Sequence, residues 1–455
     1  MIFLLGCKQE NKTPVPDNLV NIEIDSALFI TSFNNESVIP LNYYQPLIEW
    51  QGKRDSLKLY IVLENQSIQK TVSGGKWRPA AKEFKSFLDD SIVYFLLVYE
   101  DQERLFRSPI VKITVSEYSL DEAIIYRLVD PYFDPSKPAL IEKLSIEDPQ
   151  KTQSVKINSA CIGCHGYSNA ATSFNIKRDG KRRFVYSTSE NAIKDYKQKF
   201  IGHFSFFSQI IDQRYMLLAA NTFGTIDLKN DKNEPFDLIY KEGDIFVFDF
   251  EEEKLFPLPG ASELDYVEDM PSFSYDGEKI IFSKYKVTDD SIPSMDLTMI
   301  DFNGGAGGTP ETILKSEPGE YFYFGQFSPD SKWISFCKGN GCKGIFARKT
   351  SDIYLMNRQN KKIKKLNLNL DNSMDSWHKW SENSHWLIFS SKRDTTDLTS
   401  LYLTYIDDKG NDSPPIKLYG SDSLKVNIPQ YIKSDYILPD NTELNSFINE
   451  MYHIK

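Results

Sequence analysis

The sequence has little basic charge and no long apolar run. Asp and Glu number 64 against 53 Lys and Arg, which gives a formal net charge of −11 over 455 residues. Because no basic stripe is present either, the composition argues against nucleic acid as a partner. Beyond the N-terminus, no stretch approaches the length of a transmembrane helix. The hydrophobic content of 40% is that of a folded protein, and the length suggests two or three domains.

Common catalytic motifs are also missing. The sequence has no Gly-x-Ser-x-Gly nucleophile elbow and no Walker loop. The glycine-rich segment 303–308 is not followed by Lys-Ser or Lys-Thr, so we expect a loop between strands rather than a phosphate site. No catalytic residue is assigned, and whether the protein is an enzyme stays open.

Cysteine and histidine are scarce, with five of each, yet three of these residues stand together in Cys161-Ile162-Gly163-Cys164-His165. Chance placement predicts roughly 0.0006 such strings in a chain of this composition. C-x-x-C-H is the attachment signature of a c-type haem, in which both thiols bond to the haem and the histidine ligates the iron. The sequence therefore predicts covalent haem c at Cys161, Cys164 and His165.

Two other interpretations of this string remain. C-x-x-C is also half of a zinc site, and Cys337 with Cys342 could supply the other half. The two pairs are far apart in sequence, however, and His165 would have no role in such a site. A bare redox C-x-x-C is disfavoured by the adjacent histidine and by the lack of a βαβ pattern.

The first seven residues end in Leu4-Leu5-Gly6-Cys7, which resembles a bacterial lipobox with an acylated cysteine. Six residues are too few for a complete signal peptide and include no charged n-region, so we expect part of the leader to be missing. Two or more acyl chains anchor a protein stably. We therefore predict lipidation at Cys7, with residues 1–20 as signal remnant and polar tether.

The lipobox and the haem string indicate the same compartment. Haem c is attached outside the cytoplasm and a lipoprotein is exported, so we expect an outer-membrane lipoprotein facing the periplasm or the cell surface. In such oxidising surroundings, the spacing of Cys337 and Cys342 permits a small-loop disulfide. A buried pair of free thiols is the alternative.

Residues 21–117 are expected to form a small β domain. Segments rich in Val, Ile, Leu and Tyr, separated by polar turns, predict strands at 20–24, 47–50, 57–63, 92–99 and 110–115. Strands at this spacing suggest a sandwich. With 46–50 as the early Trp strand and 94–98 as the later Tyr strand, the stretch resembles Ig-like or fibronectin type III modules. No cysteine lies here, so no inter-sheet disulfide is expected.

The remaining chain, 118–455, contains a degenerate repeat. Each clear copy has an aromatic residue, a serine, a tight Asp/Asn–Gly/Ser turn and an apolar strand. The turn residues supply special backbone angles, and the alternation that follows predicts a β-hairpin. The serines, which we call anchors, are Ser274, Ser328 and Ser381, at separations of 54 and 53. A period of this size with β content predicts propeller blades.

These copies resemble the P-x-W-S-P-D-G-K-x-I-A-F repeat of TolB-like, WD40-like propellers. Weaker copies suggest further anchors at Ser168, at Ser208 and near position 431, and Ser173 to Ile176 could be the strand after Ser168. The predicted fold is all-β, with an N-terminal Ig/fibronectin-III-like sandwich followed by a propeller of six or, alternatively, seven blades.

The resemblance implies that residues just before the anchors face one mouth of the central channel. His165 and His378 each lie three residues before an anchor, so His378 is the predicted iron ligand opposite His165. Three other side chains are alternative ligands: Met270, Met374 and His203. An open, five-coordinate iron is a further alternative. Four aromatic side chains could cover the porphyrin: Tyr167, Phe206, Trp377 and Trp380.

These expectations describe an exported, lipid-anchored, mono-haem c propeller that transfers electrons or couples redox to binding. One alternative is a haem-dependent oxidoreductase or peroxidase-like enzyme. Another is a non-redox binding scaffold in an envelope or glycan-uptake assembly. The expected partners are a redox or envelope protein and, through the lipid anchor, the membrane, with no nucleic acid.

Overall fold

The structure is a computed structural model, and its contacts divide the chain into two compact units, Met1–Glu117 and Tyr118–Lys455. It describes residues 14–52, 56–85, 87–88, 91–131, 137–148, 152–157, 173–178, 182–187, 192–196, 207–211, 214–220, 225–227, 238–240, 242–288, 292–340, 348–394, 398–435, 438 and 442.

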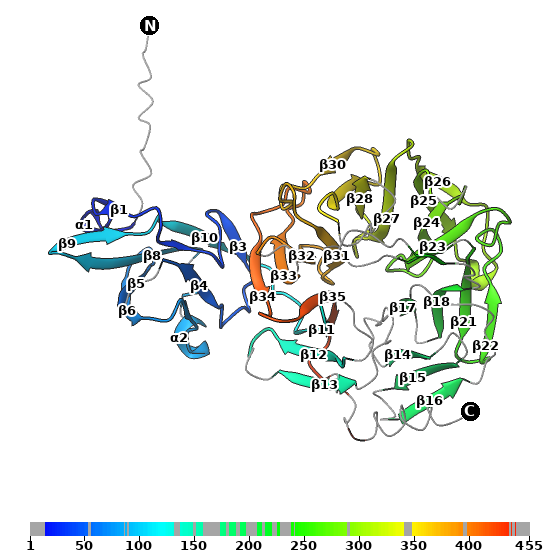
Figure 1. Ribbon diagram of the computed structural model, residues 1–455, viewed down its shortest axis with the longest axis horizontal. Helices are drawn as coiled ribbons and strands as arrows, with labels where there is room; N and C mark the ends of the chain where they lie inside the picture. Colours follow the sequence, from blue (N-terminus) through cyan, green and yellow to red (C-terminus); the bar gives the residue numbers. More distant parts are fainter. Residues whose placement is uncertain are drawn as a thin grey trace, which may run out of the picture. The chain divides into compact units, whose positions relative to one another are not determined.

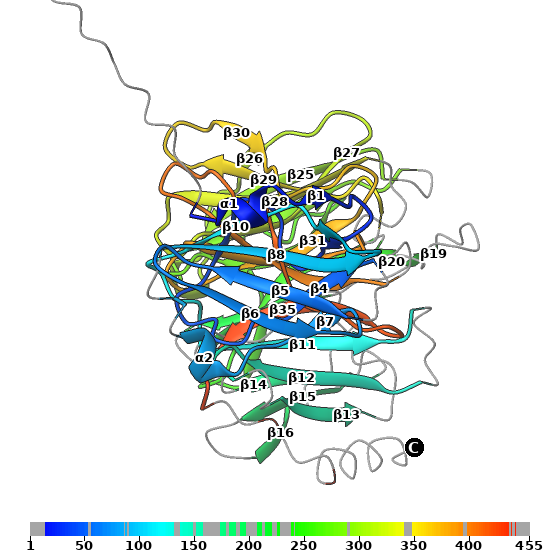
Figure 2. The same ribbon diagram turned by 90° about the vertical axis from the view of Figure 1, so that its left-hand side faces the viewer.

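The described part of the N-terminal unit is built from strands and two short helices: α1 (Asp17–Val20), β1 (Glu23–Ile24), β2 (Phe29–Ile30), β3 (Ser37–Ile39), β4 (Ile48–Gln51), β5 (Leu57–Val62), β6 (Ser67–Val72), β7 (Lys76–Trp77), α2 (Ala81–Lys85), β8 (Ile92–Asp101), β9 (Arg104–Arg107) and β10 (Val111–Val115). The long strand β8 pairs antiparallel with β5, β9 and β10. A second sheet runs in the order β2-β4-β7. Figure 2 shows β5 and β8 side by side.

The core of this unit matches its sequence pattern. In β4, Ile48 and Trp50 are buried while the residues between and after them are not, which is the alternation of a strand with one buried face. Phe33 stacks on Phe95 of β8, with ring centroids 5.8 Å apart. Four of the five expected strands are present. The first expectation is partly wrong, because residues 17–20 form α1 and only 23–24 pair as β1.

The C-terminal unit is a β-propeller whose described residues form six blades around a centre (Figure 1). Blade 1 contains β11 (Ala123–Val129), β12 (Ala139–Ser145), β13 (Gln153–Ile157) and β35 (Lys425–Ile432). Blade 2 contains β14 (Ser173–Arg178), β15 (Arg182–Ser187) and β16 (Ala192–Tyr196). Blade 3 contains β17 (Phe207–Ile211), β18 (Tyr215–Ala220), β21 (Asp244–Asp249) and β22 (Lys254–Pro257), with the small pair β19 (Thr225–Asp227) and β20 (Leu238–Tyr240) between its second and third strands.

The last three blades are the most regular. Blade 4 contains β23 (Val267–Phe273), β24 (Lys279–Tyr285), β25 (Met295–Asp301) and β26 (Glu311–Leu314), with the short helix η1 (Asn303–Gly305) in the glycine-rich segment between strands. Blade 5 contains β27 (Glu320–Phe327), β28 (Trp333–Asn340), β29 (Asp352–Asn357) and β30 (Ile363–Lys365). Blade 6 contains β31 (Asp375–Trp380), β32 (Trp386–Ser391), β33 (Ser400–Tyr405) and β34 (Ile416–Tyr419). A single parallel pair, Met295 with Tyr321, links the sheets of blades 4 and 5.

The first and last parts of this unit close the ring. β35, near the C-terminal end of the described chain, pairs antiparallel with β11, so blade 1 takes its innermost strand from the far end of the unit. The innermost strands β23, β27, β31 and β35 also contact one another in sequence around the centre. The all-β fold and the propeller are therefore confirmed, with six blades among the described residues.

The core lies between the blades as well as within them. Inner strands such as β32 are buried along their whole length because each blade is covered on both faces by its neighbours. One buried cluster joins side chains of blades 4, 5 and 6, including Met270, Tyr323 and Trp380. Within the described chain, no helix has the length and apolarity needed to cross a bilayer.

Candidate functional site

The three predicted anchor serines occupy equivalent corners, where an innermost strand turns into the next strand. In each corner the serine hydroxyl donates to the side-chain oxygen of the residue two positions later and accepts the N–H of the residue five positions later: Asp276 and Lys279 for Ser274, Asp330 and Trp333 for Ser328, and Asn383 and Trp386 for Ser381. The third turn residue is left-handed in every case: Gly277, Ser331 and Ser384. The turn chemistry predicted from the sequence is confirmed.

A feature that the sequence did not reveal precedes each corner. Four residues before the anchor, a residue other than glycine has a positive φ: Met270 (56°), Phe324 (51°) and Trp377 (48°), with Ile428 (53°) in the corresponding position of β35. The pairing register with the next strand shifts at each of these sites, so each is part of a β-bulge. Left-handed geometry costs on the order of 1–3 kcal/mol outside glycine, and bulges often re-aim nearby side chains.

The prediction of Ser208 as an anchor is wrong. In β17 the register shifts between Phe207, which pairs with Leu218, and Ile210, which pairs with Met216. Ser208 therefore corresponds to the bulged Met270 of blade 4, four residues before the anchor position. An aromatic–serine pair without an Asp-Gly turn does not fix the register, because strand pairing decides it. In β35 the anchor position is Ile432, one residue from the expected location.

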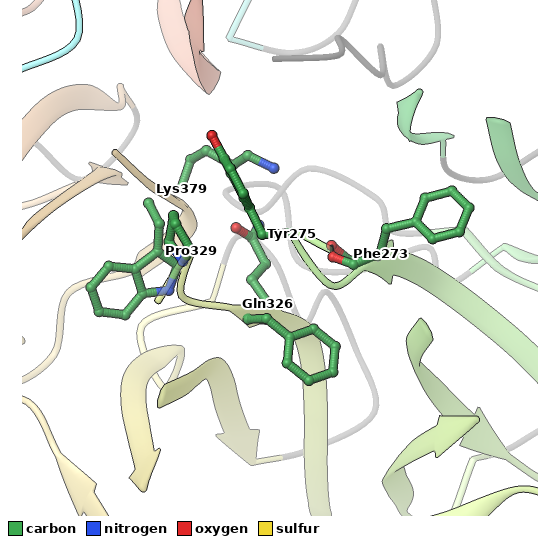
Figure 3. A pocket seen from close by; sticks show the side chains of 8 residues that line it. Phe273, Tyr275, Gln326, Pro329 and Lys379 are labelled. Carbon is green, nitrogen blue, oxygen red and sulfur yellow. Dashed lines mark hydrogen bonds between the residues drawn. The ribbon is translucent and has the colours of Figure 1, made fainter. Parts of the chain in front are cut away.

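A small pocket lies where β23, β27 and β31 end (Figure 3). Its interior is small, with room for about one water molecule. Its lining comes from equivalent positions of three consecutive blades: Ser272, Phe273 and Tyr275 from blade 4, Gln326, Phe327 and Pro329 from blade 5, and Lys379 and Trp380 from blade 6. In each blade, the lining residues thus follow the bulge and lie next to the anchor in the sequence.

Lys379 is the charged member of this lining. It is 9% exposed, and burial lowers the pKa of its ammonium group to about 8. A pKa of about 8 still leaves the side chain mostly protonated at pH 7. The equivalent residues of the neighbouring blades are the neutral Ser272 and Gln326, so blade 6 alone brings a positive charge to the pocket.

His378, the predicted iron ligand, is directed between blades 5 and 6. Its side chain is 1% exposed, and its Nδ1 lies 3.5 Å from Sγ of Cys337 on β28. Among the described residues, no group meets hydrogen-bond geometry at Nε2, although the nearby backbone oxygen of Ser335 raises the pKa of the ring. Burial dominates and lowers the pKa of the imidazole to about 3, so the ring is neutral.

Cys337 is a free, fully buried thiol, which corresponds to the free-thiol alternative rather than to a disulfide. Burial raises the pKa of this thiol to about 12, although the hydroxyl of Ser376, 3.6 Å away, has the opposite effect. A nucleophilic Cys–His pair needs a thiolate. Because both Cys337 and His378 are held neutral, the pair is not an activated nucleophile.

The remaining predicted site residues divide into two groups. Met270 and Met374 are core side chains, 5% and 0% exposed, and the hydroxyl of Ser283 lies 3.9 Å from the sulfur of Met270. The other group lies outside the described residues: Cys7, Cys161, Cys164, His165, Ser168, Tyr167, His203, Phe206 and Cys342. In the ranges that the structure describes, no group of three or more His, Cys, Asp or Glu side chains could hold a metal ion.

Sequence reasoning missed the pocket residues Ser272, Gln326 and Lys379. A signal was available, since all three lie two residues before an anchor and differ in chemistry while their surroundings repeat. The direction of their side chains depends on the bulge, which has no sequence signature because its left-handed residue is Met, Phe, Trp or Ile.

No family model and no curated protein matches this chain. Among solved structures, an oligogalacturonate lyase in complex with manganese has a TM-score of 0.39 and 10% identity, covering 66% of this chain and 74% of the other. The tricorn protease has a TM-score of 0.39 and 10% identity, with coverages of 90% and 36%. The Swd1 β-propeller domain of Myceliophteria thermophila has a TM-score of 0.38 and 8% identity, with coverages of 64% and 85%. At these TM-scores the similarities carry no argument about chemistry.

Proposed function

We propose that the protein is an exported, lipid-anchored, mono-haem c propeller of the TolB-like kind that transfers electrons. The observation that carries the proposal is the complete string Cys161-Ile162-Gly163-Cys164-His165. Its place in the repeat supports it: the strand expected after Ser168 corresponds to β14, which begins at Ser173 and opens blade 2 as described.

The chemistry of His378 is compatible with a role as the second iron ligand. Neutral imidazole nitrogen is the form that binds iron, and the low pKa of His378 keeps the ring in that form at every physiological pH. Its Nε2 is buried and lacks a hydrogen-bond partner among the described residues, which is costly unless another partner is bound. In this proposal Cys161 and Cys164 would hold the haem covalently, and His165 and His378 would be the side chains that bind its iron.

When bound, haem c supplies one-electron chemistry. The propeller would hold its ligands rigidly, because the backbone oxygen of His378 accepts a hydrogen bond of 2.8 Å from Nε2 of Gln326 on the neighbouring blade. Burial of His378 would also exclude water from that nitrogen, and exclusion of water is one means by which proteins tune a redox potential.

The attachment of haem is tested by expressing the full chain with a haem c maturation system. A pyridine haemochrome spectrum should report one covalent haem per chain, and haem staining should survive denaturing electrophoresis. C161A/C164A should abolish the stain, whereas the matched control Cys337→Ser, which changes a cysteine outside the string, should keep it. An unstained parent from a maturation-competent host would overturn the proposal and favour the binding scaffold.

The second ligand is tested separately. His378→Ala should convert a low-spin spectrum towards high spin and allow carbon monoxide to bind. The control His385→Ala changes a histidine of the same blade whose Nδ1 already lies 3.0 Å from the backbone oxygen of Ile406, and it should leave the spectrum unchanged. If His378→Ala is also unchanged, Met270, Met374 and His203 are tested next. A parent that is already five-coordinate would favour the peroxidase-like alternative.

Lipid anchoring is tested with a complete export leader. The parent should fractionate with membranes, and Cys7→Ser should release the protein or block its processing. A parent that stays unmodified and unattached would contradict this part of the proposal.

A further inference from the structure

We propose that residues 15–22, which we call the strap, hold the N-terminal unit against the lipid headgroup layer of the membrane in which Cys7 would be anchored. The inference rests on the proposed lipidation of Cys7. It adds which face of the unit meets the lipid and how far from the lipid the unit can move. Every residue that fixes the strap belongs to the described part of the chain.

The strap is packed on the outer face of the sheet that contains β8. Val15 and Leu19 are 3% and 6% exposed. They belong to one buried cluster with four side chains of β5 and β8, and Val20 and Ile22 pack against the same cluster; the four side chains are Val62, Tyr94, Leu96 and Val98. The segment that is left as a tether is therefore shorter than the tether expected from the sequence, which extended to residue 20.

Hydrogen bonds fix the end of the strap. The guanidinium of Arg107 on β9 donates from Nε and Nη2 to the backbone oxygen of Val20, at 3.3 and 2.9 Å. The strand β1, which follows directly, pairs parallel with β9, and the N–H of Asp25 donates 2.8 Å to the backbone oxygen of Arg107. A segment with buried side chains and paired backbone at its end belongs to the fold and is not a free linker.

The docked strap limits the distance between the membrane and the unit. Acyl chains are buried in the bilayer and keep the cysteine that carries them at its surface. Seven residues, 8–14, lie between Cys7 and Val15. Because an extended chain gains at most about 3.6 Å per residue, Val15 lies no farther than about 29 Å from Cys7. A domain of about 100 residues has a radius of gyration of about 13 Å, so the unit stays within about one of its own diameters of the lipid.

The attachment also decides which face of the unit is directed to the lipid. Side chains alternate along β8, so Leu96 and Val98 face the strap while Phe95 faces the other side, where it stacks on Phe33 after β2. The strap is therefore on the side opposite to the β2-β4-β7 sheet. Its exposed side chains are polar, which suits contact with headgroups rather than insertion among acyl chains; they are Asp17, Asn18 and Asn21.

The test uses the acylated full chain on vesicles of phosphatidylethanolamine and phosphatidylglycerol that carry an energy acceptor on their headgroups. A fluorescent donor is attached through an azide-bearing amino acid that replaces one of two exposed lysines. Lys58 of β5 is on the strap side, because it alternates with Tyr60 and Val62 of the cluster, and Lys76 of β7 is on the opposite sheet. Energy transfer should be at least twice as efficient from position 58 as from position 76. Equal transfer, or stronger transfer from position 76, would overturn the inference.

Two variants of α1 test the role of the strap. Leu19→Asp places a charge in the buried cluster, so it should free the strap and lower transfer from position 58 to the value at position 76. Asn18→Asp is the matched control, because it adds the same charge at an exposed position of the same helix, and it should keep the difference seen in the parent. If Leu19→Asp keeps the difference, or Asn18→Asp loses it, the docked strap does not set the orientation and the inference is wrong.

A longer tether keeps the test valid if Leu19→Asp does not fold. Insertion of about 20 Gly and Ser residues between positions 13 and 14 leaves the cluster intact, and it should lower transfer from both positions and remove their difference. An unchanged difference would overturn the inference.

The last two measurements separate the strap from the anchor. Cys7→Ser should not bind the vesicles, and binding by this variant would overturn the inference because the surface would then attach by itself. Mass spectrometry of the parent reports the acyl chains. A parent without them would overturn both the proposed anchor and this inference, whereas an acylated parent with equal transfer from positions 58 and 76 would overturn the inference alone.

Discussion

Blades 4, 5 and 6 share the same corner geometry but differ in the side chains at two positions of that corner. The anchor hydrogen bonds, the left-handed turn residue and the left-handed bulge residue recur in all three blades. The two residues between the bulge and the aromatic position are Pro271 and Ser272 in blade 4, Gly325 and Gln326 in blade 5, and His378 and Lys379 in blade 6. The repeat therefore fixes the backbone and leaves two positions free to vary, and in blade 6 both of them carry ionisable side chains.

The variation in blade 6 has a cost in stability. A histidine without a partner at Nε2 and a lysine that is 9% exposed both replace neutral residues at equivalent backbone positions. Burying an ionisable group costs free energy, and proteins tend to keep such groups at functional sites. The comparison thus identifies blade 6, rather than blades 4 and 5, as the blade with ionisable side chains at both variable positions of its corner.

The largest expected effect concerns the residue five positions after the anchor. Trp386 is fully buried, whereas its counterpart Trp333 is 9% exposed. Trp386→Ala should lower the free energy of unfolding by about 3–5 kcal/mol, as for other large core truncations, and Trp333→Ala should cost less. Urea unfolding measures both. Trp386→Phe is the control and should cost less than Trp386→Ala, because it keeps an aromatic ring in the core and Nε1 of Trp386 has no hydrogen-bond partner among the described residues. Equal losses in the two Trp→Ala variants would contradict the difference in burial.

The anchors should behave alike in all three blades. Each of the variants Ser274→Ala, Ser328→Ala and Ser381→Ala removes the same pair of hydrogen bonds and should cost about 1–3 kcal/mol of unfolding free energy. Ser208→Ala is the control, since its backbone register places it at a bulge rather than at an anchor. A loss in Ser208→Ala as large as in the other three would restore it as an anchor and refute the register assigned here.

Among the described residues, the segment that begins the propeller contacts the corner of blade 6, and this contact should depend on pH. Asp121 accepts the N–H of Glu382 at 3.2 and 3.3 Å, and burial, together with the charge of Glu382, raises the pKa of Asp121 to about 7. The folded state favours the protonated form, so this stabilising contribution is complete below pH 4 and is lost as pH rises to about 7.

Asp121→Asn should remove that dependence. Relative to the parent, the variant should become more stable by about 1–2 kcal/mol between pH 4 and pH 7, because asparagine carries no charge to desolvate. Thermal unfolding of both proteins across this range measures the difference. A constant difference at every pH would show that Asp121 has an ordinary pKa.

The smallest expected effect removes the charge that distinguishes blade 6. Lys379→Met should raise the free energy of unfolding by about 1 kcal/mol at pH 7, because replacing a desolvated charge by an apolar side chain of similar length relieves its burial cost. Urea unfolding of parent and variant measures it. If Lys379→Met is instead less stable, the ammonium group stabilises the fold, and the idea that its burial costs stability is wrong.

The sequence predicted the corners well and the side chains between them poorly. Ser274, Ser328 and Ser381 were found because Asp-Gly-type turns require particular residues, and that requirement is visible in one sequence. His378 was expected at a channel mouth, but its ring lies against Cys337 between two blades. Side-chain direction there depends on a bulge whose left-handed residue has no characteristic type, so register alone could not predict it.

The same limit explains the errors elsewhere. Ser208 shares the aromatic–serine pair of an anchor but not its pairing register, and Val20, which was expected to open a strand, is the last residue of helix α1. The sequence of a short apolar segment is compatible with both helix and strand, and the contacts with the rest of the fold determine which one forms. The number of blades could be predicted from the sequence, because it depends on the spacing of the repeats rather than on any single side chain.

The pairing of β35 with β11 has a consequence for how the molecule is made. The two strands lie about 300 residues apart in the chain, so the entropic cost of closing the ring is met only when nearly the whole propeller has been synthesised. Until then β11, whose residues are all buried in the finished fold, has one unpaired edge. Such an edge can pair with strands of other chains. A chain cut short before residue 425 would therefore keep the described strands of blades 2 to 6 and still be prone to aggregate, because the missing strand is the one that completes blade 1.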